Sequence, residues 1–456
     1  MENCFVRFNV RMVCVTLGFL LYGSAVAMGD VGNISNLPSR SDVGLGNDEN
    51  FITPSIAVSE EYTDNVFGTP SDKVTDFITH VTPGIALKYR APFWDWDLTY
   101  LLDYRYFARN SENYDFDNDL NAKGNLRIIK DFLFLDLNET YKRISLDINR
   151  NTTLDTPYAN QVDQNIVTVA PHIEFHPGAN FLVKSGYHYT NETYTNASLL
   201  STTTTPLPIP ISSEGVNYEE QGAFITTSHE LTQRSTFTTN FYYTHVSNSL
   251  DQIYNQYCPT LGVRYEYADK SFISLEGGYT WFLFENGSSR SAPYWNVEIS
   301  HEFGYMTAKL DTLVKYNSDP LYGSTEERDF KGNLDKKLQR GSFGVSVNYT
   351  EIRDNQQDTL ISKWLAIGGN IKHDLTEKLA GHLELSGEKV IYDINNLNND
   401  IITPYRFFIA TGLSYLMANN LTLSLDYNYT TYRQSIDSAA NNTEINKVFV
   451  GMKKVF

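Results

Sequence analysis

Residues 421–430 read LTLSLDYNYT and alternate apolar with polar side chains along their whole length. Leu421, Leu423 and Leu425 fall on one face together with two tyrosines, and the polar residues between them fall on the other. Successive side chains of a β-strand point to opposite sides, so a strand formed here has one apolar and one polar surface. Its ten residues also suffice for a tilted strand to cross the hydrocarbon layer of a membrane.

The same alternation recurs along the chain, whereas the 3.6-residue period of amphipathic helices is scarce. The clearest repeats are residues 96–106, 237–243, 273–283 and 306–316. Because the strands of a soluble sheet also alternate, the number of repeats matters more than any one of them. In the last repeat we expect one face to contact lipid, and it consists of Met306, Ala308, Leu310, Val314 and Tyr316.

Turn signals divide the chain into strands joined alternately by short turns and longer polar loops. Short periplasmic turns and longer extracellular loops are typical of outer-membrane barrels. A propeller or stacked sandwiches, the soluble alternative, would show a motif in every blade, and none is visible. Nine short turns and ten longer loops predict an all-β fold, a single transmembrane antiparallel up-and-down β-barrel of about 20 strands, with 18 as the alternative. The short turns are expected near Pro92, Asp131, Pro177, Thr232, Asp269, Gly304, Arg340, Thr376 and Asn419, and the loops at 64–74, 109–115, 147–163, 195–215, 247–253, 285–291, 317–327, 353–360, 392–401 and 433–442.

The first 27 residues have the pattern of a secretory signal peptide. Arg7 and Arg11 form a positive start, an apolar segment follows, and Ala25-Val26-Ala27 offers the small residues of a cleavage site. The alternative is a short membrane anchor that is never cleaved. We expect residues 1–27 to be the signal peptide, 28–49 a flexible periplasmic lead-in and 50–456 the barrel.

Composition excludes several classes of protein. The chain has 456 residues, 14% aromatics and a formal net charge of -18. Three cysteines exclude a disulfide scaffold, and the aromatic content excludes a disordered chain. An acidic surplus without a basic cluster argues against nucleic acid, because phosphate binding depends on Lys and Arg. Beyond residue 28 no run of 18 apolar residues occurs, so any span of a membrane must be made by strands.

Catalytic and metal-binding motifs are scarce. His172, Glu174 and His176 alternate along one strand face, a spacing that can hold a metal ion, but a closed site needs further ligands that the sequence does not identify. Polar lumen side chains are the simpler interpretation. No hydrolase, zinc-protease or nucleotide-binding signature is present. We therefore expect no enzymatic activity, no cofactor and no metal site.

The polar faces of the predicted strands carry charges of both signs. Such an inner face predicts a water-filled lumen, since barrels of 16 to 18 strands already leave an aqueous channel. The acidic surplus predicts either a pore that prefers cations or acidic outer loops, such as residues 393–400, that bind divalent cations bridging surface lipid. An uncharged loop at residues 199–211, with three prolines, is the candidate for a segment folded into the lumen. The residues expected to line the lumen are Asp97, Asp103, Arg105, Arg264, Glu276, Lys309, Asp311, Glu384 and Asp426.

The chain ends in KVFVGMKKVF, a strand pattern with an aromatic residue at the last position. It resembles the C-terminal signal by which the barrel-assembly machinery recognises outer-membrane proteins. The resemblance assigns that role to Gly451 and Phe456. Lys454 departs from the pattern, which usually has an apolar residue there.

The N-terminal strands carry a second resemblance. Residues 52–56 (ITPSI), 61–66 (EYTDNV), 76–79 (DFIT) and 82–85 (TPGI) resemble the opening of the outer-membrane β-barrel porin family associated with exosortase (PEP-CTERM) and exopolysaccharide loci. These motifs cover about 35 residues. The resemblance implies a barrel in the outer membrane of a Gram-negative bacterium, and for some members a conduit for exopolysaccharide.

The sequence thus leaves three functions open, besides a sheath around an electron-carrying cytochrome, for which no cysteine motif is present. The first is export of exopolysaccharide through a wide pore, with lipopolysaccharide, the barrel-assembly machinery and periplasmic polysaccharide-export proteins as partners. The second is a general diffusion porin for small solutes, which predicts that an inward segment constricts the pore. The third, an outer-membrane enzyme, is supported only by the stripe of His172, Glu174 and His176.

Overall fold

The computed structural model describes residues 51–109, 114–145, 161–198, 215–393, 405–417, 420–433 and 442–456. The predicted signal peptide, the lead-in and the loop at 199–211 lie outside these ranges. In the described part of the chain, no helix is long and apolar enough to cross a membrane. The regular elements are β1 (Phe51–Thr63), β2 (Asp76–Ala91), β3 (Trp94–Phe107), β4 (Tyr114–Ile129), β5 (Leu133–Ser145), β6 (Gln161–Gly178), β7 (Phe181–Ser198), β8 (Tyr218–Thr232), β9 (Ser235–Asn248), β10 (Tyr254–Ala268), β11 (Ser271–Phe284), β12 (Ser289–Glu302), β13 (Met306–Asp319), β14 (Gly323–Leu338), β15 (Gly341–Asp354), β16 (Leu360–Asp374), β17 (Leu379–Asp393), β18 (Tyr405–Leu416), β19 (Leu421–Arg433) and β20 (Thr443–Val455).

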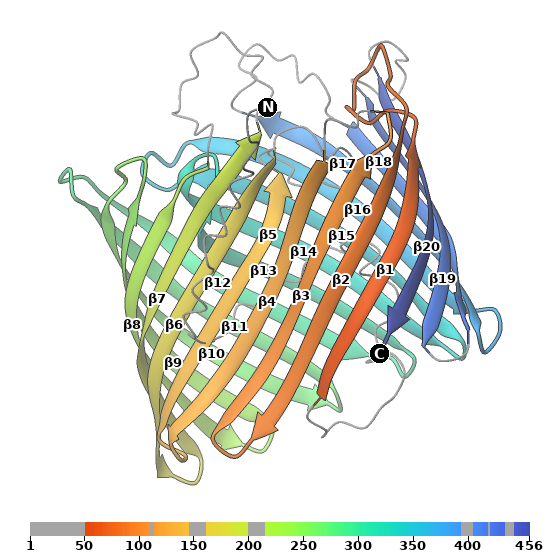
Figure 1. Ribbon diagram of the computed structural model, residues 1–456. Helices are drawn as coiled ribbons and strands as arrows, with labels where there is room; N and C mark the ends of the chain where they lie inside the picture. The colour runs from red at the N-terminus through yellow and green to blue at the C-terminus, as the bar shows by residue number, and fades with distance from the viewer. Residues whose placement is uncertain are drawn as a thin grey trace, which may run out of the picture.

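These strands form one closed antiparallel sheet of tilted strands (Figure 1). Each strand pairs with the next in the sequence, and β20 pairs with β1 in a register from Ser55 opposite Val455 to Thr63 opposite Lys447. Closure removes the two edges of an open sheet, which matters in lipid because each unpaired backbone group there costs several kcal/mol. The predicted all-β, up-and-down barrel is confirmed, and it has 20 strands rather than 18.

The two faces of the sheet differ in polarity as the alternation predicts. On the outer face Leu261, Leu310 and Val450 are 57, 61 and 58% exposed, as residues that contact lipid would be. On the inner face Asn240 and Thr260 are 6 and 2% exposed and bond to each other at 3.0 Å. The register is therefore fixed, because a shift by one residue would turn every polar side chain toward the membrane.

Short turns join the strands at one end of the barrel, close to each of the nine positions predicted for them. Asp131 and Lys270 adopt positive φ angles of 58° and 52° in two of these turns. By the rule for outer-membrane barrels this end is periplasmic, and we call the opposite end the outer end.

The predicted bounds of two outer loops are wrong. The β11–β12 connection occupies only residues 285–288 instead of 285–291, and the β13–β14 connection occupies 320–322 instead of 317–327. The polar composition of 317–327, with Pro320 and Gly323, resembles a loop. Residues 317–319 and 323–327 instead belong to two paired strands, in a register that reaches Asp319 opposite Gly323.

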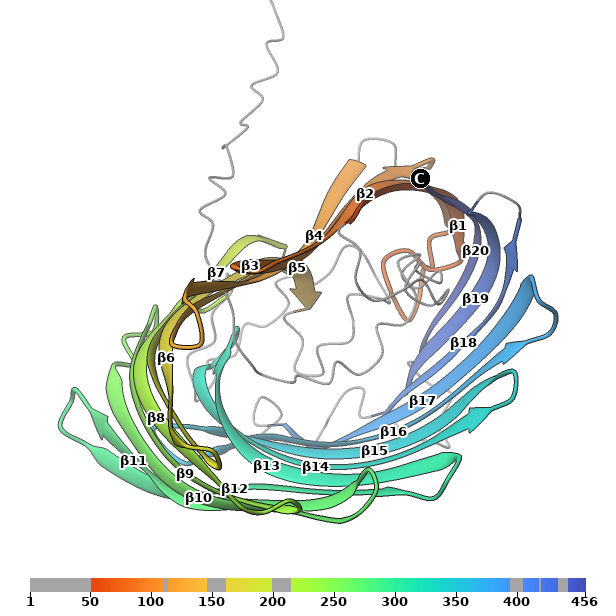
Figure 2. The same cartoon turned by 90° about the horizontal axis from the view of Figure 1, so that it is seen from below.

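The sheet is incompletely paired at its outer end in two places. β12 and β13 pair only from Asn296–Leu313 to Glu302–Thr307, so their outer halves separate. β4 and β5 pair only from Leu120–Tyr141 toward the periplasmic turn, so their outer ends separate as well. Seen along the barrel from below, the wall is indented at β5, and strand ends of the β13–β14 region curve into the ring toward β6 and β7 (Figure 2).

Candidate functional site

The nine residues predicted to line the lumen all lie on the inner alternation of their strands. Asp426, for example, stands between Leu425 and Tyr427, which are 50 and 38% exposed on the outer face. The nine are Asp97, Asp103 and Arg105 on β3, Arg264 on β10, Glu276 on β11, Lys309 and Asp311 on β13, Glu384 on β17 and Asp426 on β19.

Most of these charges have a partner on the same or the next strand. Arg90 Nη2 donates to Asp97 Oδ2 at 2.5 Å, and Lys309 Nζ lies 3.0 Å from Glu298 Oε1. Glu276 and Glu384 form no ion pair with a described residue. Further contacts are Arg264 with Glu266 (3.5 Å) and with the Phe272 ring (3.5 Å to the centroid), Glu276 with the Thr260 hydroxyl and the Asn240 amide (2.8 Å to the amide), Lys309 with Asp311 (4.0 Å) and Asp426 with His382 (3.6 Å).

Asp103 and Arg105 belong to a larger network that we call the charged belt. It runs along the outer half of the inner wall from β20 across β1 to β4 and continues onto the outer ends of β5 and β6. Its members are Lys447, Glu61, His80, Asp103, Arg105, Asp115, Asp117, Arg143 and Asp163. In order along the belt, the distances are Lys447 to Glu61 3.1 Å, Glu61 to His80 3.2 Å, His80 to Asp103 3.0 Å, Asp103 to Arg105 2.8 Å, Arg105 to Asp117 2.7 Å and to Asp115 3.6 Å, Asp115 to Arg143 2.5 Å and Arg143 to Asp163 2.8 Å.

The charged belt is largely withdrawn from solvent. The side chains of Glu61, His80 and Lys447 are 5, 9 and 10% exposed. Charges taken out of water are tolerated only when their partners are in place, so the belt depends on all of its members. Its charges largely compensate one another, and they fix seven neighbouring strands to each other near the outer mouth.

The outer half of the β13–β14 hairpin leaves the wall and enters the lumen. Val314 shares the alternation of Leu310, which is 61% exposed to the membrane side, yet Val314 is only 2% exposed. All residues from 319 to 326 are buried, which is unusual for the tip of an outer hairpin. The expectation that Val314 and Tyr316 face lipid is therefore wrong, because the hairpin has turned into the barrel and this face packs against protein instead of lipid.

One face of this hairpin covers the inner wall of β8–β12. Tyr316 packs on Phe282 with ring centroids 4.9 Å apart, and Arg290 of β12 forms an ion pair with the fully buried Glu326 of β14. The inner residues that it meets are apolar, although the inner face elsewhere is polar. They form the cluster Tyr218, Val246, Tyr254, Phe282, Phe284 and Ala292.

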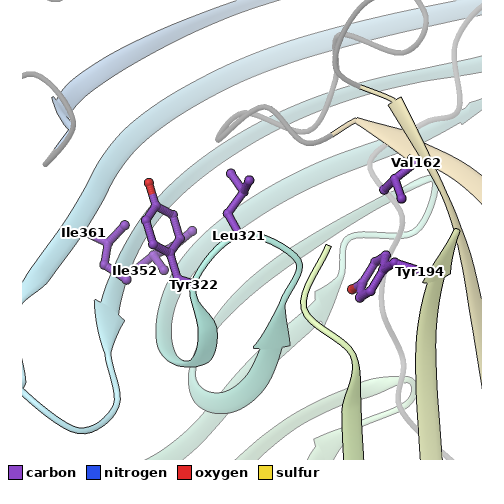
Figure 3. Packing of buried hydrophobic residues seen from close by; sticks show 6 residues of the cluster. All are labelled: Val162, Tyr194, Leu321, Tyr322, Ile352 and Ile361. Atoms are coloured by element: carbon purple, nitrogen blue, oxygen red, sulfur yellow. The ribbon is translucent and has the colours of Figure 1, made fainter. Parts of the chain in front are cut away.

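The tip of the hairpin reaches the opposite wall. Leu321 and Tyr322 join one apolar cluster with Val162 of β6 and Tyr194 of β7, and with Ile352 and Ile361 on the other side (Figure 3). Ser318 donates a hydrogen bond to Glu192 of β7. The backbone N–H of Val216 donates to the carbonyl of Pro320 at 2.9 Å. We call this contact, formed by Val162, Glu192 and Tyr194 with Ser318, Leu321 and Tyr322, the lumen bridge.

The β5–β6 side of the bridge has also left the wall. Asp163 shares the alternation of Ile173 and Phe175, which are 38 and 55% exposed, yet Asp163 is 4% exposed. Its partner Arg143 contacts Asp115, which lies on the inner face of β4. The outer ends of β5 and β6 therefore lean inward, with one face against the wall strand β4 and the other against the hairpin tip.

Two residues of the predicted stripe of His172, Glu174 and His176 have structural partners, and His176 is exposed. His172 is 4% exposed, its Nδ1 lies 2.9 Å from Asp136 Oδ2, and its ring stacks on Phe134. Its Nε2 lies 3.5 Å from Glu174, which also contacts Lys184 at 3.4 Å. Across the described ranges, no group of three or more His, Cys, Asp or Glu residues is arranged to hold a metal ion.

The residues assigned to the assembly signal lie at the closing seam. Gly451 of β20 stands opposite Ser59 of β1 and Ser424 of β19. A Cβ there would lie 3.2 Å from Ser59 Cβ, so a larger residue would crowd the seam. Phe456 is 64% exposed, and its backbone N–H donates to the carbonyl of Pro54 at 3.0 Å.

Sequence reasoning missed the lumen bridge, although two signals were present. Residues 281–284 read WFLF, so β11 is apolar on both faces at its outer end, which indicates that protein covers its inner face. Leu321 and Tyr322 also form an apolar pair inside a segment that otherwise resembles a polar loop.

Comparisons with known proteins address the fold. No model of a protein family matches the chain, and no curated protein matches it. Among solved structures, the FrpB iron transporter from Neisseria meningitidis (F3-3 variant) matches with a TM-score of 0.57 and 11% identity, covering 92% of this chain and 83% of that chain. The F5-1 variant matches with a TM-score of 0.50 and 10% identity, covering 91 and 84%. At such identities the likeness concerns the fold, which is that of a Gram-negative outer-membrane barrel, and the apolar outer face suits that membrane.

Proposed function

We propose that the protein is an outer-membrane channel for hydrophilic solutes. The observation that carries the proposal is the inner face, which outside the cluster covered by the hairpin carries charged and polar residues, whereas the outer face is apolar. A sheet closed in this way encloses a polar space in an apolar slab. The polar groups of the lumen exchange hydrogen bonds with water and solute, so a hydrophilic molecule can pass without losing its hydration entirely.

An exported polysaccharide is the first proposed cargo. It is supported by the resemblance of residues 52–85 to the porin family of exopolysaccharide loci. The solvent-exposed ion pairs of the inner face, Arg90 with Asp97 and Arg264 with Glu266, also offer donors and acceptors to sugar hydroxyls while presenting little net charge.

Diffusion of small solutes is the second proposed function, and the lumen bridge favours it. A constriction formed by an inward segment is the feature expected of a diffusion porin. Here the segment is the β13–β14 hairpin, whose tip residues Leu321 and Tyr322 reach β6 and β7.

Single-channel conductance of the refolded protein in a planar bilayer tests the proposal and separates the two cargoes. A steady conductance that soluble oligosaccharides block supports polysaccharide passage. A steady conductance that they leave unchanged supports diffusion of small solutes. A correctly folded barrel that conducts no ions contradicts the channel function.

A further inference from the structure

We infer that solutes cross the outer mouth on only one side of the lumen bridge, between the bridge and the wall formed by β1–β4 and β16–β20, and that the β13–β14 hairpin sets the width of this passage. The inference rests on the proposed channel function. The β13–β14 hairpin is then the element that selects solutes by size.

The other side of the bridge is filled by protein. Beneath the outer ends of β8–β12 the six-residue apolar cluster around Phe282 packs against Tyr316. Polar contacts close the rest of this interface: Gln252 Oε1 accepts from the backbone N–H of Ser324 at 2.9 Å, and Arg290 pairs with Glu326 and with Asp358, the latter at 2.8 Å. Close-packed interiors leave no room for a hydrated solute.

The hairpin is held as a fixed part of the barrel. Besides its contacts with β8–β12, its tip bonds to Glu192, which also accepts hydrogen bonds from the Gln164 amide at 2.5 Å and from the Tyr194 hydroxyl. Gly323 has a φ of 78°, and a Cβ on it would lie 2.4 Å from Gln252 Oε1. Glycine at this turn permits both the positive φ angle and the close contact with Gln252, so the turn packs directly against its neighbours.

The remaining face of the hairpin borders the passage. Lys315 Nζ lies 2.9 Å from both Glu327 Oε1 and Asp329 Oδ2, and Lys331 Nζ lies 3.0 Å from Asp329. The lysine and Glu327 side chains are 22 to 33% exposed. Like the charged belt across the lumen, this face is polar and its charges compensate one another. The passage therefore sorts solutes mainly by size.

Shortening the hairpin tests the inference. Residues 318–324 are replaced by Asn-Gly, which forms a tight turn between Asn317 and Thr325, a pair in the native register. The matched control replaces residues 285–287 of the exposed β11–β12 turn by the same dipeptide. We expect the shortened hairpin to raise the single-channel conductance about twofold and to admit larger polyethylene glycols, since the cross-section of a pore grows as the square of its diameter. The control keeps the wild-type conductance.

Wild-type conductance in the folded, shortened variant overturns the inference and leaves the proposed function intact. Absence of conductance in the wild-type protein instead contradicts the proposed function.

A second pair of variants does not require the hairpin to be cut. In a Cys258→Ala background, Lys315→Cys and Tyr316→Cys place thiols on neighbouring residues that face the passage and the filled side. An anionic methanethiosulfonate should reduce the current through Lys315→Cys channels and leave Tyr316→Cys channels unchanged. An equal response, or a response of Tyr316→Cys alone, overturns the inference.

Discussion

The periplasmic half and the outer half of this barrel have the same alternation of apolar and polar residues, but the faces of their strands contact different surroundings. In the periplasmic half, one face meets lipid and the other faces the lumen. In the outer half, Val314 and Asp163 occupy the membrane-facing alternation yet are 2 and 4% exposed. The comparison shows that alternation assigns a residue to one face of its strand, whereas the neighbouring strands decide what that face meets.

Residues on the membrane-facing alternation become buried in the outer half because β4 pairs incompletely with β5, and β12 with β13. Where these ladders end, the outer strand ends are free to lean inward and meet across the lumen. Burial of apolar side chains such as Phe282 and Leu321 favours that arrangement, because each fully buried side chain of this size contributes about 1.5–3 kcal/mol.

Replacing Phe282 should have the largest effect on the outer half. Because this inner-face residue packs beneath Tyr316, Phe282→Ala should lower the free energy of unfolding by about 3–5 kcal/mol, as cavities in close-packed cores do. Phe241→Ala, on the membrane-facing side of β9, is the matched control and should cost less. Equal effects, measured by urea unfolding in lipid vesicles, would place Phe282 in an open lumen.

Removing the charge of Glu326 should lower the free energy of unfolding nearly as much as Phe282→Ala does. Glu326→Gln leaves Arg290 and Arg328 without their buried carboxylate, and breaking such a pair typically costs about 3 kcal/mol. Glu302→Gln, which loses only the exposed partner Lys270, should cost less than about 1 kcal/mol. The same unfolding assay distinguishes them, and a negligible cost at Glu326 would argue against a packed interface between hairpin and wall.

Two glycines offer a test of how closely the hairpin tip approaches its neighbours. Gly323 and Gly287 have φ angles of 78° and 84°, but only a Cβ at Gly323 would meet other atoms within 4 Å. Both alanine variants store backbone strain of about 1–3 kcal/mol. Gly323→Ala should be the more destabilised of the two in the unfolding assay. A reversed order would mean that the tip is not packed against the β9–β10 turn.

The smallest effect concerns ion selectivity. Glu384→Gln removes an inner-face carboxylate that has no ion-pair partner among the described residues, so the preference for cations should fall slightly. Asp97→Asn should change it less, because Arg90 already compensates that charge. Reversal potentials in a salt gradient report both values, and a larger change at Asp97 would contradict this view of the lumen.

The fold could be predicted from the sequence because membrane-spanning strands must repeat one short pattern. The segment LTLSLDYNYT and its repeats therefore indicate strand number and face, and the lumen-facing alternation of Asp103 and Asp426 follows from it. The lumen bridge could not be predicted in this way. Its contacts join residues far apart in the sequence, such as Glu192 and Ser318, and local alternation carries no information about where a strand leaves the wall.

A cross-link across the lumen tests whether the hairpin tip contacts β6. Cysteines at Val162 and Leu321, in a Cys258→Ala background in native membranes, should be joined by a short bifunctional reagent, as cysteines at the paired positions Thr168 and Thr190 should be. Both pairs should cross-link within one chain. Cross-linking of the Thr168–Thr190 pair alone, with Val162 and Leu321 each labelled separately, would show that the hairpin stands away from β6 and would contradict the lumen bridge.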